Sequence, residues 1–453
     1  MAGFVTVIGG GLAGCEAAYQ LAKRGNHVRL FEMRPVKSTA VHKTGNLAEL
    51  VCSNSLRSDD PFHPVGLLKR EMESWDSLII KAARANALPA GGALAVDRDG
   101  FSSFIKENLD QLNTVEVIHE EITCLPEGPA ILAAGPLCSE ALSDSLYKFL
   151  GSKALYFYDA IAPVVEYESI NLDIAFPQSR YGKGDGEDYL NIPLDEQTYR
   201  RFVSDVLEAD RVVDKAQEKM IYFEGCLPIE VMASRGEDTL RFGPMKPVGL
   251  TDPRTGKQPY AVIQLRQDNF AKSLWNLVGF QTQMKWPDQK RILRSLPGLE
   301  SVKIVRHGMI HRNTYVNSPK YLDAMFRCKG RESLFLAGQI SGVEGYVESA
   351  ASGLMAGVHM ARLLKSLPVN PFPPETAMGS LAHYVSFPGH QKFQPTNVNF
   401  GIIASKQVRK KSRKSDRRKA QVLEAISSMQ VFAERLGEEL CPVLDWNVGF
   451  SHS

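Results

Sequence analysis

The chain has 453 residues, of which 44% are hydrophobic and 23% are charged, so it has the length and composition of a globular protein with two or three domains. Its formal net charge of +2 excludes a general polycation, and no apolar run approaches the roughly 18 residues that a membrane-spanning helix needs. Seven scattered cysteines without a C-x-x-C pair argue against a disulfide framework and a metal site, and with a strand directly at the N-terminus we expect a cytoplasmic protein.

The first predicted elements have the pattern of a dinucleotide-binding unit. Residues 4–8 form an apolar β-branched run, followed by a glycine-rich turn, a helix over residues 14–23 and a second apolar strand that ends on Glu32. Glycines in this spacing allow a tight turn, close approach to a pyrophosphate and close packing of helix on strand, and the acid accepts hydrogen bonds from a ribose. The expected cofactor-binding residues are Gly9, Gly10, Gly11, Leu12, Ala13, Gly14 and Glu32.

A long polar stretch separates Glu32 from the next expected helix, and such a long loop is usually functional. It contains Cys52 among Ser53, Asn54 and Ser55. Hydrophobic periodicity then predicts helices over residues 65–86 and 101–112, and strands over residues 115–119, 122–125 and 129–136.

From about residue 165 the pattern changes to short strands and charged helices. We expect helices over residues 195–207 and 287–295, and strands over residues 220–226, 240–245, 260–265, 277–280 and 302–307. The doubly wound pattern returns with an apolar strand over residues 333–339 and a helix over residues 348–364. Another helix is expected over residues 417–436.

The sequence therefore predicts an α/β fold, with a discontinuous Rossmann-like FAD-binding domain and an α+β insertion domain. The FAD-binding domain covers residues 1–165 and 326–440, with a basic helical C-terminal region; the insertion covers residues 166–325, and residues 441–453 form a flexible tail. FAD is favoured over NAD because the second strand-to-helix turn suits the ribityl and isoalloxazine end of a flavin. Its expected contacts are Gly338, Gln339 and Gly345.

Two cysteines, Cys52 and Cys226, have the small and polar neighbours that are typical of an accessible thiol. The residues alone leave a chemical and a structural role equally open for both, and no spacing rule shows that they meet in space. Cys15, Cys138 and Cys328 are most simply explained as packing or surface residues.

Six segments, spread in order over residues 1–440, resemble the bacterial folate- and FAD-dependent tRNA (uracil-5-)-methyltransferases. They read GGGLAGCEAAYQLAKRGNHVRLFEMRP, ELVCSNSLRSD, YFEGCLPIEVMASRG, LRFGPMKPVGL, FLAGQISGVEGYVESAASGLMAG and FQPTNVNFGI. The resemblance implies reductive C5-methylation of the T-loop uridine (position 54) of tRNA. It implies 5,10-methylenetetrahydrofolate as carbon donor, FAD as carrier of methylene and hydride, and NADH or NADPH as reductant.

The same resemblance implies roles for three residues. Cys226 is the thiolate that adds to uracil C6 and so activates C5. Cys52 is the base that removes the C5 proton, or a thiol that guards the flavin intermediate. Tyr346 lies close to the flavin ring, and the target base must be flipped out of the tRNA elbow to reach it.

A tRNA substrate makes the basic run at residues 406–419 the best candidate for phosphate contacts, although such runs are more often solvated surface. The expected tRNA-binding residues are Lys406, Arg409, Lys410, Lys411, Arg413, Lys414, Arg417 and Arg418. A second basic candidate lies in the insertion: Lys285, Arg291, Arg294, Arg306 and Arg312. Three aromatic residues could each stack on an unpaired base or belong to the core: Trp286, Tyr315 and Phe242.

Two alternatives stay open. One is wobble-uridine modification, as in the related GidA-type flavoproteins, which are longer and carry a C-terminal helical domain. The other is a non-catalytic flavin-containing tRNA-binding protein, which would leave the two cysteines unexplained. The sequence does not distinguish a monomer from a homodimer.

Overall fold

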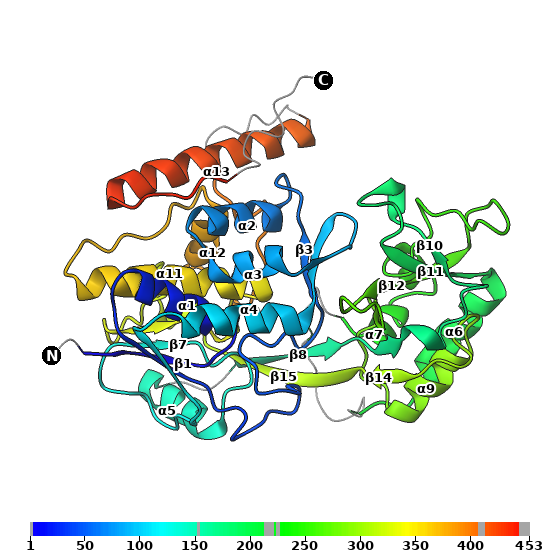
Figure 1. Ribbon diagram of the computed structural model, residues 1–453, viewed down its shortest axis with the longest axis horizontal. Helices are drawn as coiled ribbons and strands as arrows, with labels where there is room; N and C mark the ends of the chain where they lie inside the picture. The colour runs from blue at the N-terminus through cyan, green and yellow to red at the C-terminus, as the bar shows by residue number, and fades with distance from the viewer. Residues whose placement is uncertain (1–2, 152–154, 213–221, 223–226, 406–412, 444–453) are drawn as a thin grey trace.

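The computed structural model describes residues 3–151, 155–212, 222, 227–405 and 413–443, which form two lobes (Figure 1). The first lobe contains a five-stranded sheet in the order β16-β7-β1-β2-β6, in which every neighbouring pair is parallel. Because β16 joins the sheet from a distant part of the chain, the predicted discontinuous α/β fold is confirmed. The strands are β1 Val5–Ile8, β2 Val28–Phe31, β6 Val115–Ile118, β7 Ala130–Leu132 and β16 Leu334–Leu336.

Helices pack around this sheet, and the long helix α13 lies on the outside of the lobe, above α2 and α12 in Figure 1. Trp75 attaches α13 to the lobe, since its indole N–H donates to Met429 Sδ at 3.1 Å and its ring packs on Phe432. The helices are α1 Leu12–Lys23, α2 Pro64–Ser74, α3 Leu78–Ala85, α4 Arg98–Asp110, α5 Glu140–Leu150, α10 Ser318–Tyr321, α11 Tyr346–Leu364, α12 Ala377–Ser386 and α13 Lys414–Leu436. A small antiparallel sheet lies beside them, with strands β3 Ser55–Ser58, β4 Ala87–Leu88 and β5 Ala93–Val96.

The prediction of one helix over residues 65–86 is wrong, because the chain forms α2 and α3 with a turn between them. Asp76 has a φ of 62°, in the left-handed region where a right-handed helix cannot continue. The Ser77 hydroxyl then accepts the backbone N–H of Ile80 and caps the start of α3.

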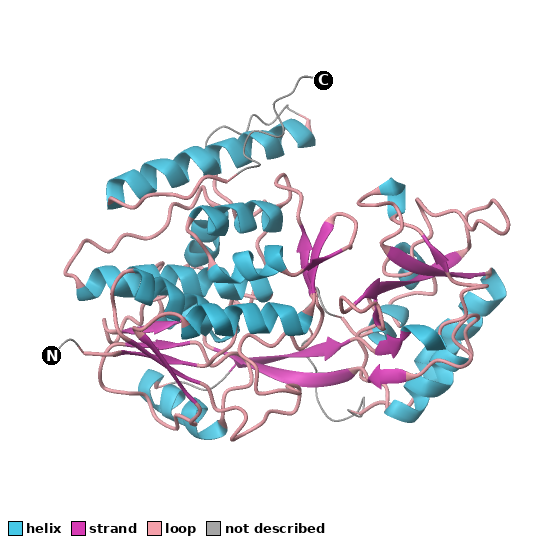
Figure 2. Cartoon of the chain, in the orientation of Figure 1, coloured by secondary structure: helices cyan, strands magenta, loops and turns pink. Residues whose placement is uncertain are grey.

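The second lobe contains a six-stranded sheet in the order β10-β11-β12-β13-β9-β14, in which all pairs are antiparallel (Figure 2). It encloses a second hydrophobic core, separate from that of the first lobe. The strands are β9 Val164–Glu166, β10 Phe176–Pro177, β11 Tyr189–Leu194, β12 Ala261–Gln267, β13 Leu274–Leu277 and β14 Ile304–Arg306. The helices are α6 Glu196–Glu208, α7 Ile229–Ala233, α8 Thr239–Phe242 and α9 Trp286–Arg294.

Two of the predicted strands are wrong, and a third is displaced along the chain. Residues 240–245 belong to the short helix α8 and the turn after it, where Met245 N–H donates back to the Leu240 carbonyl at 2.8 Å. Residues 122–125 join no strand, since Leu125 N–H donates to the Ser145 hydroxyl. The strand predicted at residues 277–280 lies earlier in the chain, as β13, which ends at Leu277. Most of the strand predicted at 220–226 lies outside the described residues.

The two lobes are connected by a two-stranded antiparallel ribbon of β8 Leu155–Ile161 and β15 Met309–Tyr315. Figure 2 shows this ribbon running from the parallel sheet towards the second lobe. Side chains on one face of the ribbon therefore lie where the two lobes meet. None of the described helices combines the length and the apolar character needed to cross a bilayer.

Candidate functional site

A cavity of about 430 Å³ lies where the glycine-rich turn, the ribbon and the start of α11 come together. It brings together segments that are far apart in the sequence. Its walls include Gly11, Glu32, Cys52, Asp159, His311 and Tyr346. This convergence makes the cavity the candidate site.

The turn after β1 has the conformation that a phosphate-binding turn requires. Gly9 has a φ of 105°, and a Cβ on Gly14 would lie 1.8 Å from the Gly9 carbonyl oxygen. A Cβ on Gly11 would instead meet no atom of the described residues within 4 Å, and Gly11 lines the cavity. Gly14 therefore serves the fold, whereas the space beside Gly11 is left for a ligand. The N-terminus of α1 adjoins this space and favours negative charge.

Glu32 directly follows β2 and is 5% exposed, and its carboxylate already accepts several hydrogen bonds. Oε2 accepts the Gly10 N–H at 2.9 Å, and Oε1 accepts the backbone N–H and the Nε–H of Arg34, both at 2.9 Å. Burial opposes ionisation, but the hydrogen bonds and charge of Arg34 outweigh it and hold the pKa of Glu32 below its usual value. The oxygens of an ionised Glu32 can accept ribose hydroxyls in addition to these N–H donors.

The second strand-to-helix turn lies on another wall of the cavity. Gly338, Gln339 and Gly345 all line it, as does Tyr346 at the first position of α11. Gly338 N–H donates to the Ser352 hydroxyl at 2.7 Å, and the Gln339 amide donates to the Glu344 carboxyl. The two predicted halves of the cofactor site thus share one cavity.

The loop that carries Cys52 is held from three sides. The Tyr346 hydroxyl accepts the backbone N–H of Cys52 at 2.7 Å and that of Ser53 at 3.3 Å. Arg98, paired with Asp268, donates to the Leu50 carbonyl. Arg266 donates to the Ser53 hydroxyl at 2.7 Å and to the Asn54 amide oxygen at 3.1 Å. The position of the thiol is therefore fixed by side chains from both lobes.

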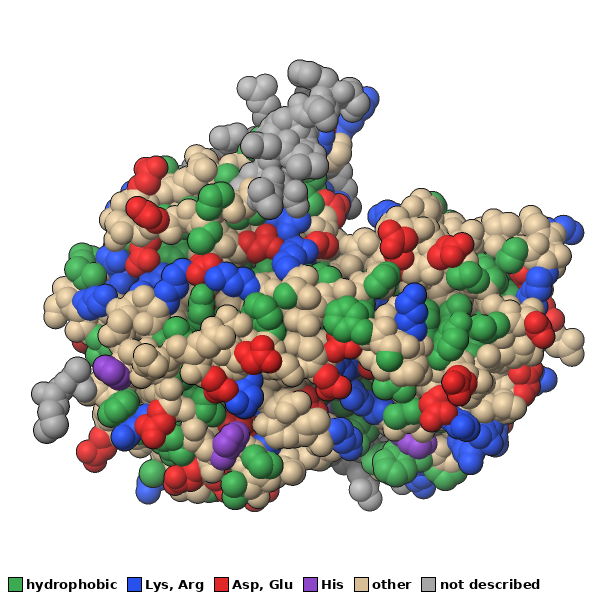
Figure 3. All heavy atoms as spheres, in the orientation of Figure 1, with side chains coloured by type: hydrophobic (Ala, Val, Ile, Leu, Met, Phe, Trp, Pro, Cys, Tyr) green, Lys and Arg blue, Asp and Glu red, His purple; other side chains and the backbone are tan. Residues whose placement is uncertain are grey.

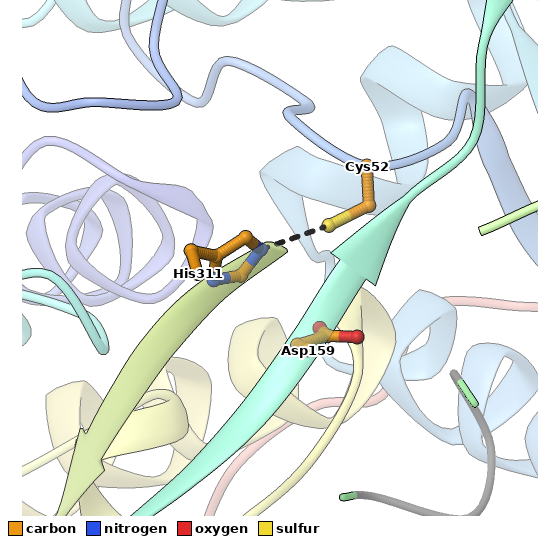
Figure 4. Close-up of side chains that lie close together, drawn as sticks. All are labelled: Cys52, Asp159 and His311. Carbon is orange, nitrogen blue, oxygen red and sulfur yellow. Dashed lines mark hydrogen bonds between the residues drawn. The ribbon is translucent and has the colours of Figure 1, made fainter. Parts of the chain in front are cut away.

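Cys52 faces two titratable side chains of the ribbon (Figure 4). Its Sγ lies 3.9 Å from His311 Nε2, and Asp159 stands directly opposite His311 in the β8–β15 ladder. The thiol, imidazole and carboxylate atoms all lie within 4.8 Å of one another. Two ligands of one zinc ion would be roughly 3.5 Å apart, so the observed arrangement is looser than a formed metal site and suits proton transfer.

The surroundings of Cys52 favour the neutral thiol. The side chain is half-buried, and burial together with the charges of Asp159 and Glu344 raises its pKa well above the usual value. Burial and the charge of Asp159 also raise the pKa of Glu344 well above its usual value. The thiol is thus less exposed than its small, polar sequence neighbours suggest, and it needs a proton acceptor before it can act as a base.

Much of the predicted catalytic and tRNA-binding set lies outside the described residues: Cys226, Lys406, Arg409, Lys410 and Lys411. Arg413 and Arg418 are exposed, Arg417 is half-buried, and Lys414 begins α13. The Arg418 guanidinium lies over the Phe400 ring. Acidic and basic side chains are interspersed over the face seen in Figure 3, in keeping with the small net charge.

In the second basic candidate, Lys285 and Arg291 are paired with carboxylates. Lys285 pairs with Asp210, and Arg291 pairs with Asp205 and Asp288. Of the three aromatic candidates, Tyr315 is a core residue, whereas Trp286 and Phe242 are 57% and 74% exposed.

The sequence prediction did not include Asp159, His311, Arg98 or Arg266. The available signal was the alternation of β15, in which His311, Asn313 and Tyr315 point to the buried side. Pairing with β8, about 150 residues earlier, cannot be recognised from either strand alone.

The chain matches the family described as "Glucose inhibited division protein A" over residues 4–368. It is 56% identical over 399 residues to the methylenetetrahydrofolate–tRNA-(uracil-5-)-methyltransferase TrmFO of Exiguobacterium sibiricum, covering 88% of this chain and 92% of that protein. It is 52% identical over 432 residues to the protein of the same name from Bacillus subtilis, covering 95% and 99%. The solved structure of Aquifex aeolicus GidA is similar with a TM-score of 0.68 at 17% identity, over 96% of this chain and 73% of GidA, which shows the fold.

Proposed function

This chain belongs to the family of methylenetetrahydrofolate–tRNA-(uracil-5-)-methyltransferases, and from that membership we propose that it transfers a one-carbon unit from 5,10-methylenetetrahydrofolate to C5 of a tRNA uridine. The target is the T-loop uridine at position 54, FAD is the cofactor, and NADH or NADPH is the reductant. The reaction takes place in the cytoplasm.

One observation carries this proposal: a single cavity joins the dinucleotide-binding turn to a positioned thiol. A simple nicotinamide-binding domain needs the turn only. Here the start of α11 both lines the cavity and holds Cys52 through Tyr346. A cofactor laid from Gly11 to Tyr346 would end beside the thiol.

The residues present fit FAD. The open space beside Gly11 and the N-terminus of α1 suit a pyrophosphate, and Glu32 suits a ribose. The start of α11 offers backbone N–H groups and a positive dipole end to the far end of the ligand. When bound, FAD supplies the one-carbon carrier and hydride chemistry that a reductive methylation needs.

The protein's own part in the reaction is thiol and proton chemistry. Uracil C5 is a weak nucleophile, and we assign its activation to Cys226, whose thiolate adds to C6 and places negative charge on C5 and O4. After the new carbon bond forms, the C5 proton has to leave, and Cys52 is the assigned acceptor. Expulsion of the Cys226 thiolate then restores the aromatic ring.

The tRNA phosphates are assigned to the basic segment that leads into α13. Arg413 and Arg418 are exposed there, and exposed guanidinium groups neutralise phosphates without reading sequence.

A direct test uses the purified yellow protein with tRNA that lacks base modifications, NADH or NADPH, and methylenetetrahydrofolate. Nucleoside analysis should find 5-methyluridine at position 54, and Cys226→Ala should lose this product while FAD and tRNA stay bound. Modification at the wobble uridine instead would favour the GidA-type alternative. Binding of FAD and tRNA without any product would favour the non-catalytic alternative.

A further inference from the structure

His311 is placed to control the protonation of Cys52. The ring is buried in the ribbon, and its Nε2 is the nitrogen that faces Sγ, at 3.9 Å. This distance is at the long end for a hydrogen bond to sulfur, and catalytic hydrogen bonds are often long before the substrate binds. The backbone of Cys52 is fixed by Tyr346, so the pair is held together from both sides.

Asn313 determines which nitrogen of His311 carries the proton. It lies two residues along β15, on the same face, and its Oδ1 is 2.7 Å from His311 Nδ1. An amide oxygen in this position accepts a proton from Nδ1, so the lone pair of the neutral ring is on Nε2, towards the thiol. Among the described residues the Asn313 amide nitrogen is buried and has no hydrogen-bond partner, so the contact of this amide with His311 is made by its oxygen.

Asp159 completes the arrangement from the neighbouring strand. Its carboxylate is buried and opposite His311 in the ladder, so it opposes a lone thiolate but stabilises an imidazolium. A neutral thiol beside a carboxylate therefore ionises favourably only when its proton moves to the ring.

We propose that His311, oriented by Asn313, accepts the Cys52 proton and so converts this thiol into the base of the reaction. The S–H bond breaks, a bond from the same proton to Nε2 forms, and a thiolate–imidazolium pair results. The thiolate then takes the uracil C5 proton, and the imidazolium returns its own proton to water. The role of the thiolate as base rests on the proposed function; the proton transfer within the pair does not.

Other charged and titratable groups around the pair come from several elements. They are Asp159 of β8, Glu344 before α11, Tyr346 of α11, Arg98 of α4, and His42 in the polar loop. None of them is altered in the variants below, so a change in the pH profile reports on His311 and Asn313.

The test is the pH dependence of Cys52 alkylation in the FAD-bound protein. Iodoacetamide is applied between about pH 6 and 9, and the labelled Cys52 peptide is measured by mass spectrometry, with Cys52→Ser as the blank. An isolated buried thiol reacts slowly at neutral pH, so we expect His311→Gln to react at least about 10-fold more slowly at pH 7 and to shift the profile to higher pH. Asn313→Ala should lie between His311→Gln and the unaltered protein.

His307→Gln is the matched control, because His307 stacks on Trp286 outside the cavity and its loss should leave the profile unchanged. Superimposable profiles for His311→Gln and the unaltered protein would overturn the inference. If His311→Gln loses FAD, Asn313→Ala decides by the same criterion. If the unaltered protein does not methylate tRNA but His311→Gln still slows Cys52 alkylation, the proposed function is refuted and the proton transfer from Cys52 to His311 is not.

Discussion

Tyr346 is expected to hold the Cys52 loop through its hydroxyl group, and Tyr346→Phe removes that group with little change in shape. The hydroxyl accepts two backbone N–H groups, one at 2.7 Å and one at 3.3 Å. A buried donor left without a partner costs about 1–3 kcal/mol, and the longer bond contributes little. We therefore expect the closed loop to lose about 2 kcal/mol, or roughly 30-fold in its opening equilibrium.

Hydrogen–deuterium exchange measures this opening directly, since the amide of Cys52 exchanges only when its bond is broken. A peptide spanning residues 50–56 should exchange roughly 30-fold faster at its protected amides in Tyr346→Phe. Tyr181→Phe, at an exposed tyrosine, is the control and should leave this peptide unchanged. Equal exchange in Tyr346→Phe and the unaltered protein would refute the holding role of the hydroxyl.

Three further predictions concern the cofactor turn, a buried lysine and the basic segment. Gly11→Ala should weaken FAD binding at least about 10-fold without lowering the free energy of unfolding of the FAD-free protein. Gly14→Ala should lower both the affinity for FAD and the free energy of unfolding, because among the described residues only this second methyl group would meet protein atoms. Equal effects of the two variants in FAD titration and in urea unfolding would contradict this. Burial lowers the pKa of Lys69 to about 7, so the unfolded chain binds more protons above that pH, and the free energy of unfolding should rise from pH 7 towards 10. Lys69→Met should lose this rise. If urea titrations give parallel curves of unfolding free energy against pH for Lys69→Met and the unaltered protein, the prediction is wrong. The double variant Arg413→Ala/Arg418→Ala should reduce the slope of log affinity against log salt for tRNA by about 1–2, and an unchanged slope would remove this segment from the phosphate contacts.

The dinucleotide-binding half of the fold could be predicted because its signals are local. A short apolar strand, a glycine turn and a helix follow one another directly, and the structure has β1, the turn and α1 in that order. The helix starts at Leu12 rather than residue 14, and the first strand starts at Val5 rather than residue 4. The returning strand β16 and helix α11 were recognised for the same reason.

Cys52 and Tyr346 were predicted, but the residues around Cys52 could not be, because they depend on contacts between distant segments. His311 has a polar sequence environment that does not mark it as a site residue. Its role follows from Asp159 across the ladder and from Cys52, which lies in a loop more than 250 residues earlier. The error at residues 65–86 has a different cause. Continuous helical periodicity hid a turn that the left-handed backbone of Asp76 and the Ser77 cap create.

Isotope transfer shows most directly whether this chain methylates tRNA uridine with a carbon from folate. The enzyme is given unmodified tRNA, reductant and methylenetetrahydrofolate with both methylene hydrogens replaced by deuterium, and the product nucleoside is weighed by mass spectrometry. We expect 5-methyluridine that retains both deuterium atoms and gains its third hydrogen from the reductant. Unlabelled 5-methyluridine, or no product in a protein that still binds FAD and tRNA, would contradict it.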